Sequence, residues 1–175
     1  GAEIDLTILD AKKNKKEVTL RTYMEQCPAG LGVDKAVSLL MPVAALIRNM
    51  HSDGNLHLQI SPDSIKVHHG IAHISEPTSN ESDRYSSGFA SPEAYRHKGV
   101  SGAADIYSFC AVLLYAATGS IPENVLNLDE NESISIHESI QDDDFVLMIK
   151  KGLSRDYNNR FKGMQELIYE MLPFT

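Results

Sequence analysis

The amino-acid sequence predicts a mainly α-helical domain of the α+β family, with a few short strands. Three amphipathic segments and one segment that is apolar on every side have helical lengths, while several shorter runs alternate as strands do. The chain length of 175 residues suits a single hydrophobic core. We therefore expect one domain over residues 1–175, built as a helical bundle around a central buried helix.

The N-terminal residues predict a strand, a turn and a short helix. Apolar and polar residues alternate from Ile4 to Leu9, which is typical of a strand. A turn rich in lysine follows, and the pattern from Thr19 to Gln26 favours a short helix. The lysines of the turn are Lys12, Lys13, Lys15 and Lys16.

A longer helix is expected next. Asp34 is a favourable N-cap residue, and apolar residues recur at helical spacing from Val37 until Asp53 and Gly54 end the pattern. Pro42 lies inside this helix and removes one backbone hydrogen bond. We expect a kink at Pro42 and not an end, because the apolar stripe continues on both sides of it.

Three short runs and an exposed loop follow this helix. Residues Leu56–Ile60, Ser64–Val67 and Ile71–Ser75 alternate between apolar and polar side chains, which indicates small strands around a loop. Residues 77–89 are rich in Ser, Asn, Asp and Gly, so they are expected to form an exposed loop.

The C-terminal part predicts three helices. Residues Asp105–Thr118 are apolar on every side and Gly119 is placed to end them, which indicates the central buried helix. Residues Phe145–Leu153 and Met164–Met171 have amphipathic patterns. The acids Asp142–Asp144 precede the first of these helices, where a negative charge favours the positive end of the helix dipole.

Charge disfavours a nucleic-acid partner. The net charge is −8, and the stretch from Pro122 to Asp144 contains eight acidic residues with no Lys or Arg. Binding to phosphates needs a basic surface, and the only basic run is the lysine-rich turn. The acidic stretch is either a docking face for a basic partner or a solvated surface, and short charged connections are usually solvated.

The apolar runs and the cysteines indicate where in the cell the chain is expected to be found. The longest apolar run, Phe109–Ala117, is too short to span a bilayer, so we expect no membrane contact. Cys27 and Cys110 have no metal-type spacing and do not form a disulfide framework. A reducing compartment such as the cytoplasm is therefore expected.

Four motifs occur in order along the chain. They are HLQISPDSIKV at His57–Val67, GFASPEAY at Gly88–Tyr95, ADIYSFCAVLLYAATGSIP at Ala104–Pro122 and SRDYNNRF at Ser154–Phe161. Together they resemble the catalytic loop, the end of the activation segment, helix F and the element before the last helix of eukaryotic-type Ser/Thr protein kinases of Gram-positive bacteria. The resemblance runs from about Ile4 to the C-terminus and implies the fold of a protein kinase-like C-terminal lobe.

The resemblance implies structural roles for four residues. Asp105 is expected to accept hydrogen bonds from the backbone around His57, and His57 is expected to be a core histidine. Glu93 and Arg160 are expected to form a buried ion pair, because a planar guanidinium suits such a bidentate contact. The alternative is that Glu93 and Arg160 are unrelated surface charges.

The same resemblance implies that the catalytic residues are missing. The catalytic Asp falls on Gln59, whose amide is not a base at neutral pH. The metal-binding Asn falls on Ser64, and the D-F-G triplet falls on residues 76–78, where only Glu76 keeps a carboxylate. The Arg before the catalytic Asp falls on Leu58. We therefore expect no catalytic residue, no bound cofactor and no metal site, with Glu76 as the one weak metal candidate.

The upper lobe of the kinase fold is expected to be absent. Its Gly-rich turn and its Lys–Glu pair have no counterpart in this sequence, and residues 4–18 would supply only its last strand and the hinge. Residues 19–175 would form the helical lobe, which cannot enclose ATP alone. The uncovered surface would then be open to a partner protein, to the rest of a parent chain or to a second copy in a homodimer.

The sequence leaves three functions open. The favoured function is a catalytically inactive pseudokinase module that acts in protein binding or regulation. The second is an unorthodox ATP- and Mg-dependent Ser/Thr phosphotransferase whose N-terminal lobe lies outside this sequence, with Glu76 as the metal ligand. The third is a freestanding helical adaptor that evolved from a kinase.

Two other groups of residues are weaker candidates. A metal site at His68, His69 and His73 is disfavoured, because adjacent histidines in a strand point to opposite faces and no carboxylate lies at ligand spacing. Several hydroxyls of the exposed loop are either phosphorylation targets or ordinary loop residues. They belong to Ser79, Ser82, Tyr85, Ser86 and Ser87.

Overall fold

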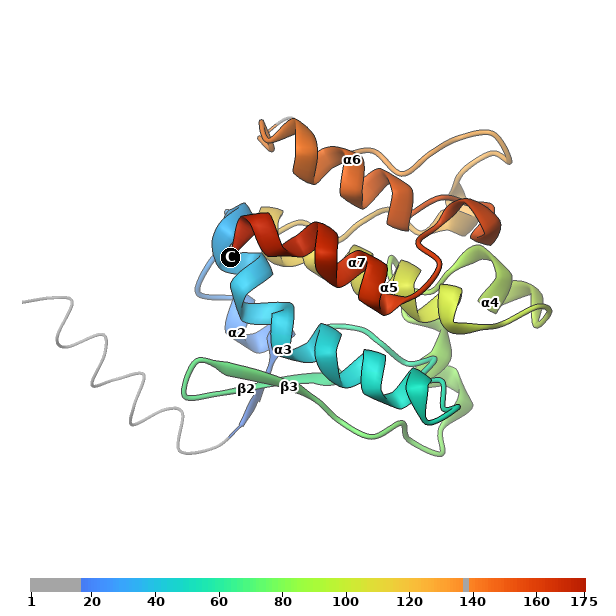
Figure 1. The fold of residues 1–175 in the computed structure, drawn as a ribbon, viewed down its shortest axis with the longest axis horizontal. Helices are drawn as coiled ribbons and strands as arrows, with labels where there is room; N and C mark the ends of the chain where they lie inside the picture. The colour runs from blue at the N-terminus through green and yellow to red at the C-terminus, as the bar shows by residue number, and fades with distance from the viewer. Residues whose placement is uncertain (1–16, 137–138) are drawn as a thin grey trace, which may run out of the picture.

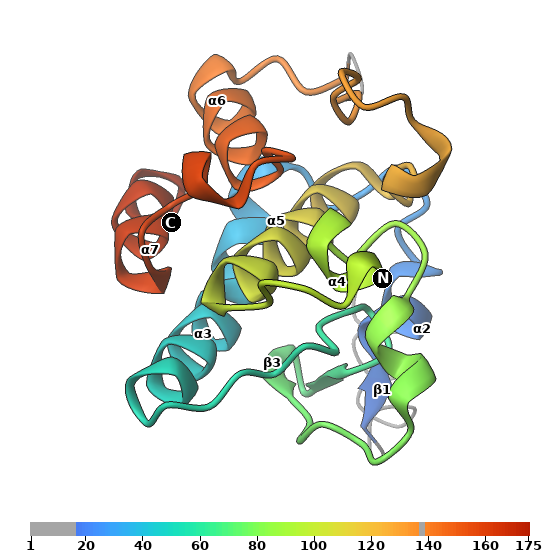
Figure 2. The ribbon, with the colours of Figure 1, turned by 90° about the vertical axis from the view of Figure 1, so that its right-hand side faces the viewer.

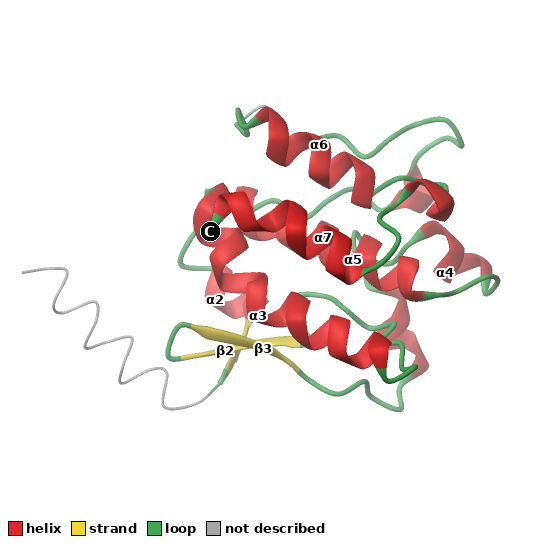
Figure 3. Cartoon of the chain, viewed as in Figure 1, coloured by secondary structure: helices red, strands yellow, loops and turns green. Residues whose placement is uncertain are grey.

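The computed structural model describes residues 17–136 and 139–175 and contains a mainly helical fold with one small sheet (Figures 1 and 3). The helices are α2 (Leu20–Met24), α3 (Val33–Ser52), α4 (Pro92–Arg96), α5 (Gly102–Thr118), α6 (Asp143–Gly152) and α7 (Met164–Met171). The strands are β1 (Val18–Thr19), β2 (Ile65–His68) and β3 (Ile71–Ile74). The predicted fold class is confirmed. The expected strand Ile4–Leu9 and the lysine-rich turn lie outside the described residues.

Helix α5 forms the centre of the molecule (Figures 1 and 2). Every residue from Ala104 to Thr118 is buried, as the all-round apolar sequence predicts. The helix begins at Gly102, three residues before the predicted start, and ends at Gly119, which adopts a left-handed φ of 77°. Helices α3 and α6 pack against α5, and α7 packs against α3.

The buried C-terminal end of α5 is closed by the loop before α3. The N–H groups of Leu31 and Gly32 donate to the carbonyls of Ala116 and Ala117, at 2.8 and 3.1 Å. Carbonyls at a helix end have no partner within the helix, so these bonds satisfy groups that burial would otherwise leave unpaired. Gly30 permits the close approach, because a Cβ atom there would lie 2.2 Å from the Ala117 carbonyl oxygen.

The N-cap residue of helix α3 differs from the sequence prediction. Its N-cap is Gly32, and Asp34 lies inside the first turn. The carboxylate of Asp34 is still near the positive end of the helix, where it is favourable. The helix continues through Pro42 to Ser52, because the apolar residues on both sides of Pro42 remain buried.

The small sheet is antiparallel in the order β1-β2-β3. Val67 of β2 pairs with Val18 of β1 and with Ala72 of β3. Strands β2 and β3 are joined at His69 and Gly70, both of which have positive φ, as tight hairpin turns require. Helix α3 packs against β3.

The predicted strand at Leu56–Ile60 is wrong. These residues belong to no strand and form a loop between α3 and β2. The alternation in the sequence does not match the burial of this loop, because the polar His57 and Gln59 are buried together with Ile60, whereas the apolar Leu56 is exposed.

The other predicted helices agree closely with the structure, whereas no sequence pattern predicts helix α4 or strand β1. Helix α6 begins two residues earlier than predicted, and the side chain of Asp142 caps it by accepting from the Phe145 N–H. The expected loop at 77–89 contains one 3₁₀ helix, Glu81–Tyr85. Among residues 17–136 and 139–175, no helix is both long and apolar enough to cross a lipid bilayer.

Candidate functional site

Asp105 anchors the loop at residues 57–61 to the central helix. It lies in the first turn of α5 and is fully buried. Its Oδ2 accepts from the His57 N–H and its Oδ1 accepts from the Leu58 N–H, both at 2.8 Å. The Nε2 atom of His51, in the last turn of α3, lies 2.8 Å from Oδ2. One carboxylate therefore joins α3, α5 and the loop.

Leu58 has a backbone conformation that a leucine rarely adopts. Its φ is 65°, in the left-handed region, which costs a residue with a side chain about 1–2 kcal/mol. The charge-assisted hydrogen bond from its N–H to Asp105 offsets this cost. The turn at Leu58 aims the next residue, Gln59, away from the core helix and toward Thr78.

His57 has a structural role in this loop. The side chain is 3% exposed, and its Nδ1 accepts from the Gln59 N–H at 3.1 Å. Its Nε2 lies 2.7 Å from the Ser75 carbonyl oxygen. Because a backbone N–H can only donate, Nδ1 carries no proton and Nε2 donates to Ser75. His57 is thus a neutral imidazole that connects the loop to the residue after β3.

Gln59 binds one residue of the following segment with both polar atoms of its side chain. Its Oε1 accepts from the Thr78 N–H at 2.7 Å, and its Nε2 donates to the Thr78 carbonyl at 2.9 Å. Gln59 is 6% exposed. An ionised carboxylate in this position could make only the first of these bonds, because it has no donor.

The hydroxyl of Ser64 is also engaged within the loop. It accepts from the Ser61 N–H and donates to the Ser61 carbonyl, both at 3.1 Å. The Ser61 hydroxyl accepts from the Asp63 N–H at 3.2 Å. These bonds form a compact turn of the kind that serine side chains stabilise.

A polar cavity of about 290 Å³ lies beside this loop. It brings together three residues that the sequence singles out, namely Gln59, Ser64 and Glu76. Two further carboxylates line it, but Asp63 pairs with Arg21 and Asp83 accepts from the Thr78 hydroxyl. Glu76 has no ion pair with any described residue. Among the described residues no three potential ligands converge in a metal-binding arrangement.

Arg21 shifts the titration of Asp63 at the rim of the cavity. Its Nε and Nη2 atoms donate to the two carboxylate oxygens at 2.8 and 3.0 Å. The hydrogen bond from Arg21 lowers the pKa of Asp63 below its ordinary value, against the opposing effect of burial. Because Asp63 is occupied by this pair, it is not an open ligand.

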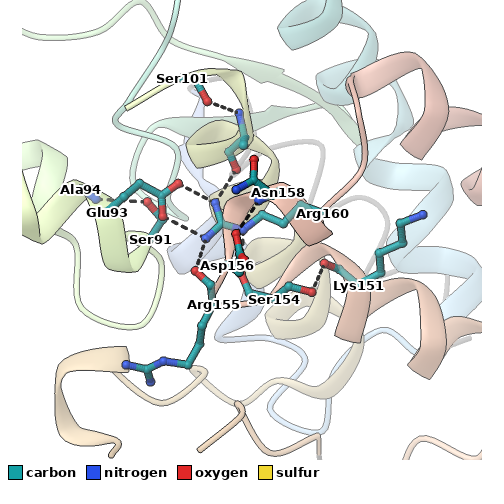
Figure 4. A network of polar contacts seen from close by, with 11 residues as sticks. Ser91, Glu93, Ala94, Ser101, Lys151, Ser154, Arg155, Asp156, Asn158 and Arg160 are labelled. Atoms are coloured by element: carbon teal, nitrogen blue, oxygen red, sulfur yellow. Dashed lines mark hydrogen bonds and ion pairs between the residues drawn. The ribbon is translucent and has the colours of Figure 1, made fainter. Parts of the chain in front are cut away.

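Below the loop, Glu93 and Arg160 form the expected buried ion pair (Figure 4). Arg160 donates from Nη1 and Nη2 to the two oxygens of Glu93, at 2.6 and 2.9 Å. Its remaining N–H groups donate to the carbonyls of Ala103, Ser154 and Arg155. All five donors of the guanidinium are therefore satisfied, although the side chain is 1% exposed.

The three histidines of the sheet region do not form a cluster. His73 pairs with Glu17 at 3.1 Å. His68 and His69 meet edge to face, with ring centroids 4.1 Å apart. Cys110 is also unlike a catalytic thiol, because burial raises its pKa to about 12 and keeps it protonated.

An aromatic cluster that the sequence did not predict holds the segment after Thr78. The Tyr85 hydroxyl lies 2.9 Å from Nδ1 of His97, and its ring stacks on Tyr95 with centroids 5.9 Å apart. His97 ends α4 in a left-handed conformation, which turns its ring toward Tyr85. Of the three residues only Tyr95 lies in one of the sequence motifs, and its partners meet it only in the fold.

No family model and no curated protein matches the chain. Among solved structures it is similar to the kinase domain of PknI from Mycobacterium tuberculosis, with a TM-score of 0.74 at 18% identity. That match covers 91% of this chain and 63% of the PknI kinase domain. A second crystal structure of the same domain matches with a TM-score of 0.71 and 62% of its length covered. The chain thus has a protein kinase-like fold and spans less than two thirds of the kinase domains it matches.

Proposed function

We propose that the chain is a catalytically inactive, kinase-like module that acts by binding or regulating other proteins. The observation that carries this proposal is the double hydrogen bond between Gln59 and Thr78. In a protein kinase, the residue at this place orients the substrate hydroxyl and accepts its proton. The amide of Gln59 has no basic lone pair, and both of its polar atoms already have backbone partners.

The neighbouring residues support the same proposal. Ser64 uses its hydroxyl in a local turn, and His57 uses both ring nitrogens in hydrogen bonds to the backbone. Leu58 contributes no cation. These side chains stabilise the loop, and we propose that they do so in place of the catalytic residues of an active kinase.

A second candidate function is favoured by one observation. Glu76 lines the polar cavity and has no ion-pair partner among the described residues. Mg²⁺ is commonly bound through one or two carboxylates together with the phosphates of a nucleotide. An unorthodox phosphotransferase that uses Glu76 for the metal, with an upper lobe from outside this sequence, is therefore the alternative.

Titration with Mg-ATP by calorimetry separates the two functions. We expect no saturable heat and no phosphate transfer to a protein substrate. The informative variant is Glu76→Gln, and Glu25→Gln is its matched control at an exposed site away from the cavity. Saturable binding at millimolar concentration or below that is lost only in Glu76→Gln would contradict the inactive module and favour the phosphotransferase.

A further inference from the structure

A groove between α6 and α7 forms a second candidate binding site, and none of its lining residues lines the polar cavity. The groove exists because the two helices pack on different neighbours, α6 on α5 and α7 on α3. Its volume is about 330 Å³. One wall is a single face of α6, because three of its lining residues lie three, four and seven positions after the first one. They are Asp144, Leu147, Met148 and Lys151.

The base of the groove is apolar and already shaped. Met148 and Phe161 are 5% and 4% exposed and form its base. Phe174 forms part of the opposite wall and is fixed by an edge-to-face contact with Phe145, with centroids 5.8 Å apart. Leu147 stands at the edge with 65% of its surface exposed. A bound apolar side chain would therefore cover Leu147 without rearranging the base.

The rim of the groove carries unbalanced negative charge. Lys151 is occupied, because its Nζ lies 3.2 Å from Glu166 and 4.9 Å from the centroid of the Phe161 ring. Asp144 and Glu170 line the groove from its two sides and have no ion pair with any described residue. The net charge of −8 adds a long-range attraction for cations.

We propose that this groove binds a short segment of another protein that carries a large apolar side chain flanked by Lys or Arg. The apolar side chain would enter between Leu147 and Phe174, and the flanking cations would reach Asp144 and Glu170. A second copy of this chain fits less well, because a symmetric interface would bring the two acidic rims together. The proposal is independent of the polar cavity and holds whether or not the chain binds nucleotide.

The test uses fluorescence anisotropy with a labelled peptide that contains two adjacent leucines flanked by lysines. We expect saturable binding that weakens as salt is raised, since the rim charges are exposed. Two comparison peptides, one with glutamates in place of the lysines and one with serines in place of the leucines, should not bind. Binding of the glutamate peptide as tightly as the lysine peptide, or no binding of the lysine peptide, would overturn the proposal.

Matched variants locate the site on the protein. Leu147→Ser should weaken binding about tenfold, whereas Leu126→Ser, at a leucine that is 62% exposed elsewhere, should not change it. The double variant Asp144→Asn/Glu170→Gln should weaken binding about tenfold or more, whereas Asp129→Asn/Glu130→Gln changes the net charge equally and should have little effect. Equal effects of the two double variants would show attraction to net charge alone and would overturn the proposal.

Two further measurements distinguish loss of peptide binding from unfolding of the variant and from self-association of the chain. Glu170→Gln alone leaves the first turn of α6 unchanged, so it tests the rim if the Asp144 variant unfolds. Sedimentation velocity detects self-association. A dimer that Leu147→Ser dissociates would assign the groove to a second copy and would overturn the proposed partner.

Discussion

Arg160 holds Glu93 through two parallel hydrogen bonds of 2.6 and 2.9 Å, and both side chains are almost completely buried. The described residues also contain a second bidentate pair, in which Nε and Nη2 of Arg21 donate to Asp63 and both side chains are substantially exposed. The two pairs therefore allow the stability contribution of an Arg–carboxylate ion pair to be compared between a buried and a solvent-exposed site. Burial is what should separate their contributions to stability.

Replacing Arg160 with Lys should destabilise the fold by about 2–4 kcal/mol. Lysine keeps the charge but has one nitrogen where Arg160 uses three, so buried carbonyls such as those of Ser154 and Ala103 lose their donors. The control Arg21→Lys should cost less than about 1 kcal/mol. Urea denaturation measures both free energies of unfolding. Similar losses in the two variants would contradict the idea that burial sets the difference.

The stability contribution of Asp63 should depend on pH. Its pKa in the folded state is lowered from 3.8, chiefly by the hydrogen bond from Arg21. The folded state therefore favours the ionised carboxylate, so the contribution is present above pH 3.8 and is lost as the pH falls through the lower folded pKa. Because the pair is exposed, we expect less than about 1 kcal/mol.

Acid titration of stability checks the prediction for Asp63. The difference in free energy of unfolding between the wild type and Asp63→Asn should be constant near neutral pH and should shrink in acid. In an Arg21→Met background the same difference should become nearly independent of pH. A difference that grows as the pH falls would have the wrong sign for this ion pair.

Replacing Gln59 with Glu should loosen the segment that begins at Thr78. The variant loses the donor to the Thr78 carbonyl and places a charged oxygen against it, while the bond from the Thr78 N–H can remain. Hydrogen–deuterium exchange should become faster in residues 77–86. Gln165→Glu is the matched control, because that amide is on the surface and accepts from Arg48. Unchanged exchange in the Gln59 variant would show that the amide does not hold the segment.

Gly152→Ala should destabilise the contact between α6 and α5. A Cβ atom at Gly152 would lie 2.2 Å from Sγ of Cys110, so the packed helices would have to separate. We expect a loss of about 1–3 kcal/mol. Gly163→Ala is the control, because a Cβ atom there meets nothing within 4 Å. Thermal denaturation compares the two, and Cys110→Ala in the Gly152→Ala background should restore part of the stability by removing the sulfur atom.

The helices could be predicted because their signals are local. Helix α7 has the bounds Met164–Met171 that its apolar spacing predicts, and Gly119 ends α5 as expected. The start of α3 could not be predicted as well. Its N-cap is Gly32 because the preceding loop is tied to the end of α5, and that contact joins residues far apart in the sequence.

The wrong strand at Leu56–Ile60 has a related cause. The backbone of this loop is held by Asp105, which binds the N–H groups of His57 and Leu58 from 48 and 47 residues away. Hydrophobic periodicity assumes that apolar side chains face the core, and it fails where buried hydrogen bonds cover polar side chains such as His57 and Gln59 instead.

In the candidate site, too, contacts between recognisable motifs could be predicted and contacts with residues outside the motifs could not. The Glu93–Arg160 pair could be expected because each residue lies in its own recognisable motif. The Gln59–Thr78 link could not, because Thr78 lies in a segment whose composition predicts only a loop. The amide at position 59 could be read from the sequence, whereas the partner of that amide, Thr78, could be identified only from the fold.

The bonds that Asp105 and Arg160 make do not involve the residues that line the polar cavity. Asp105 and Arg160 make their bonds beneath the cavity, among buried carbonyls and backbone N–H groups. Glu76 and Ser82, in contrast, line the cavity from exposed positions. A protein engineer could therefore install a new ligand site on these outer positions, with the underlying scaffold left untouched.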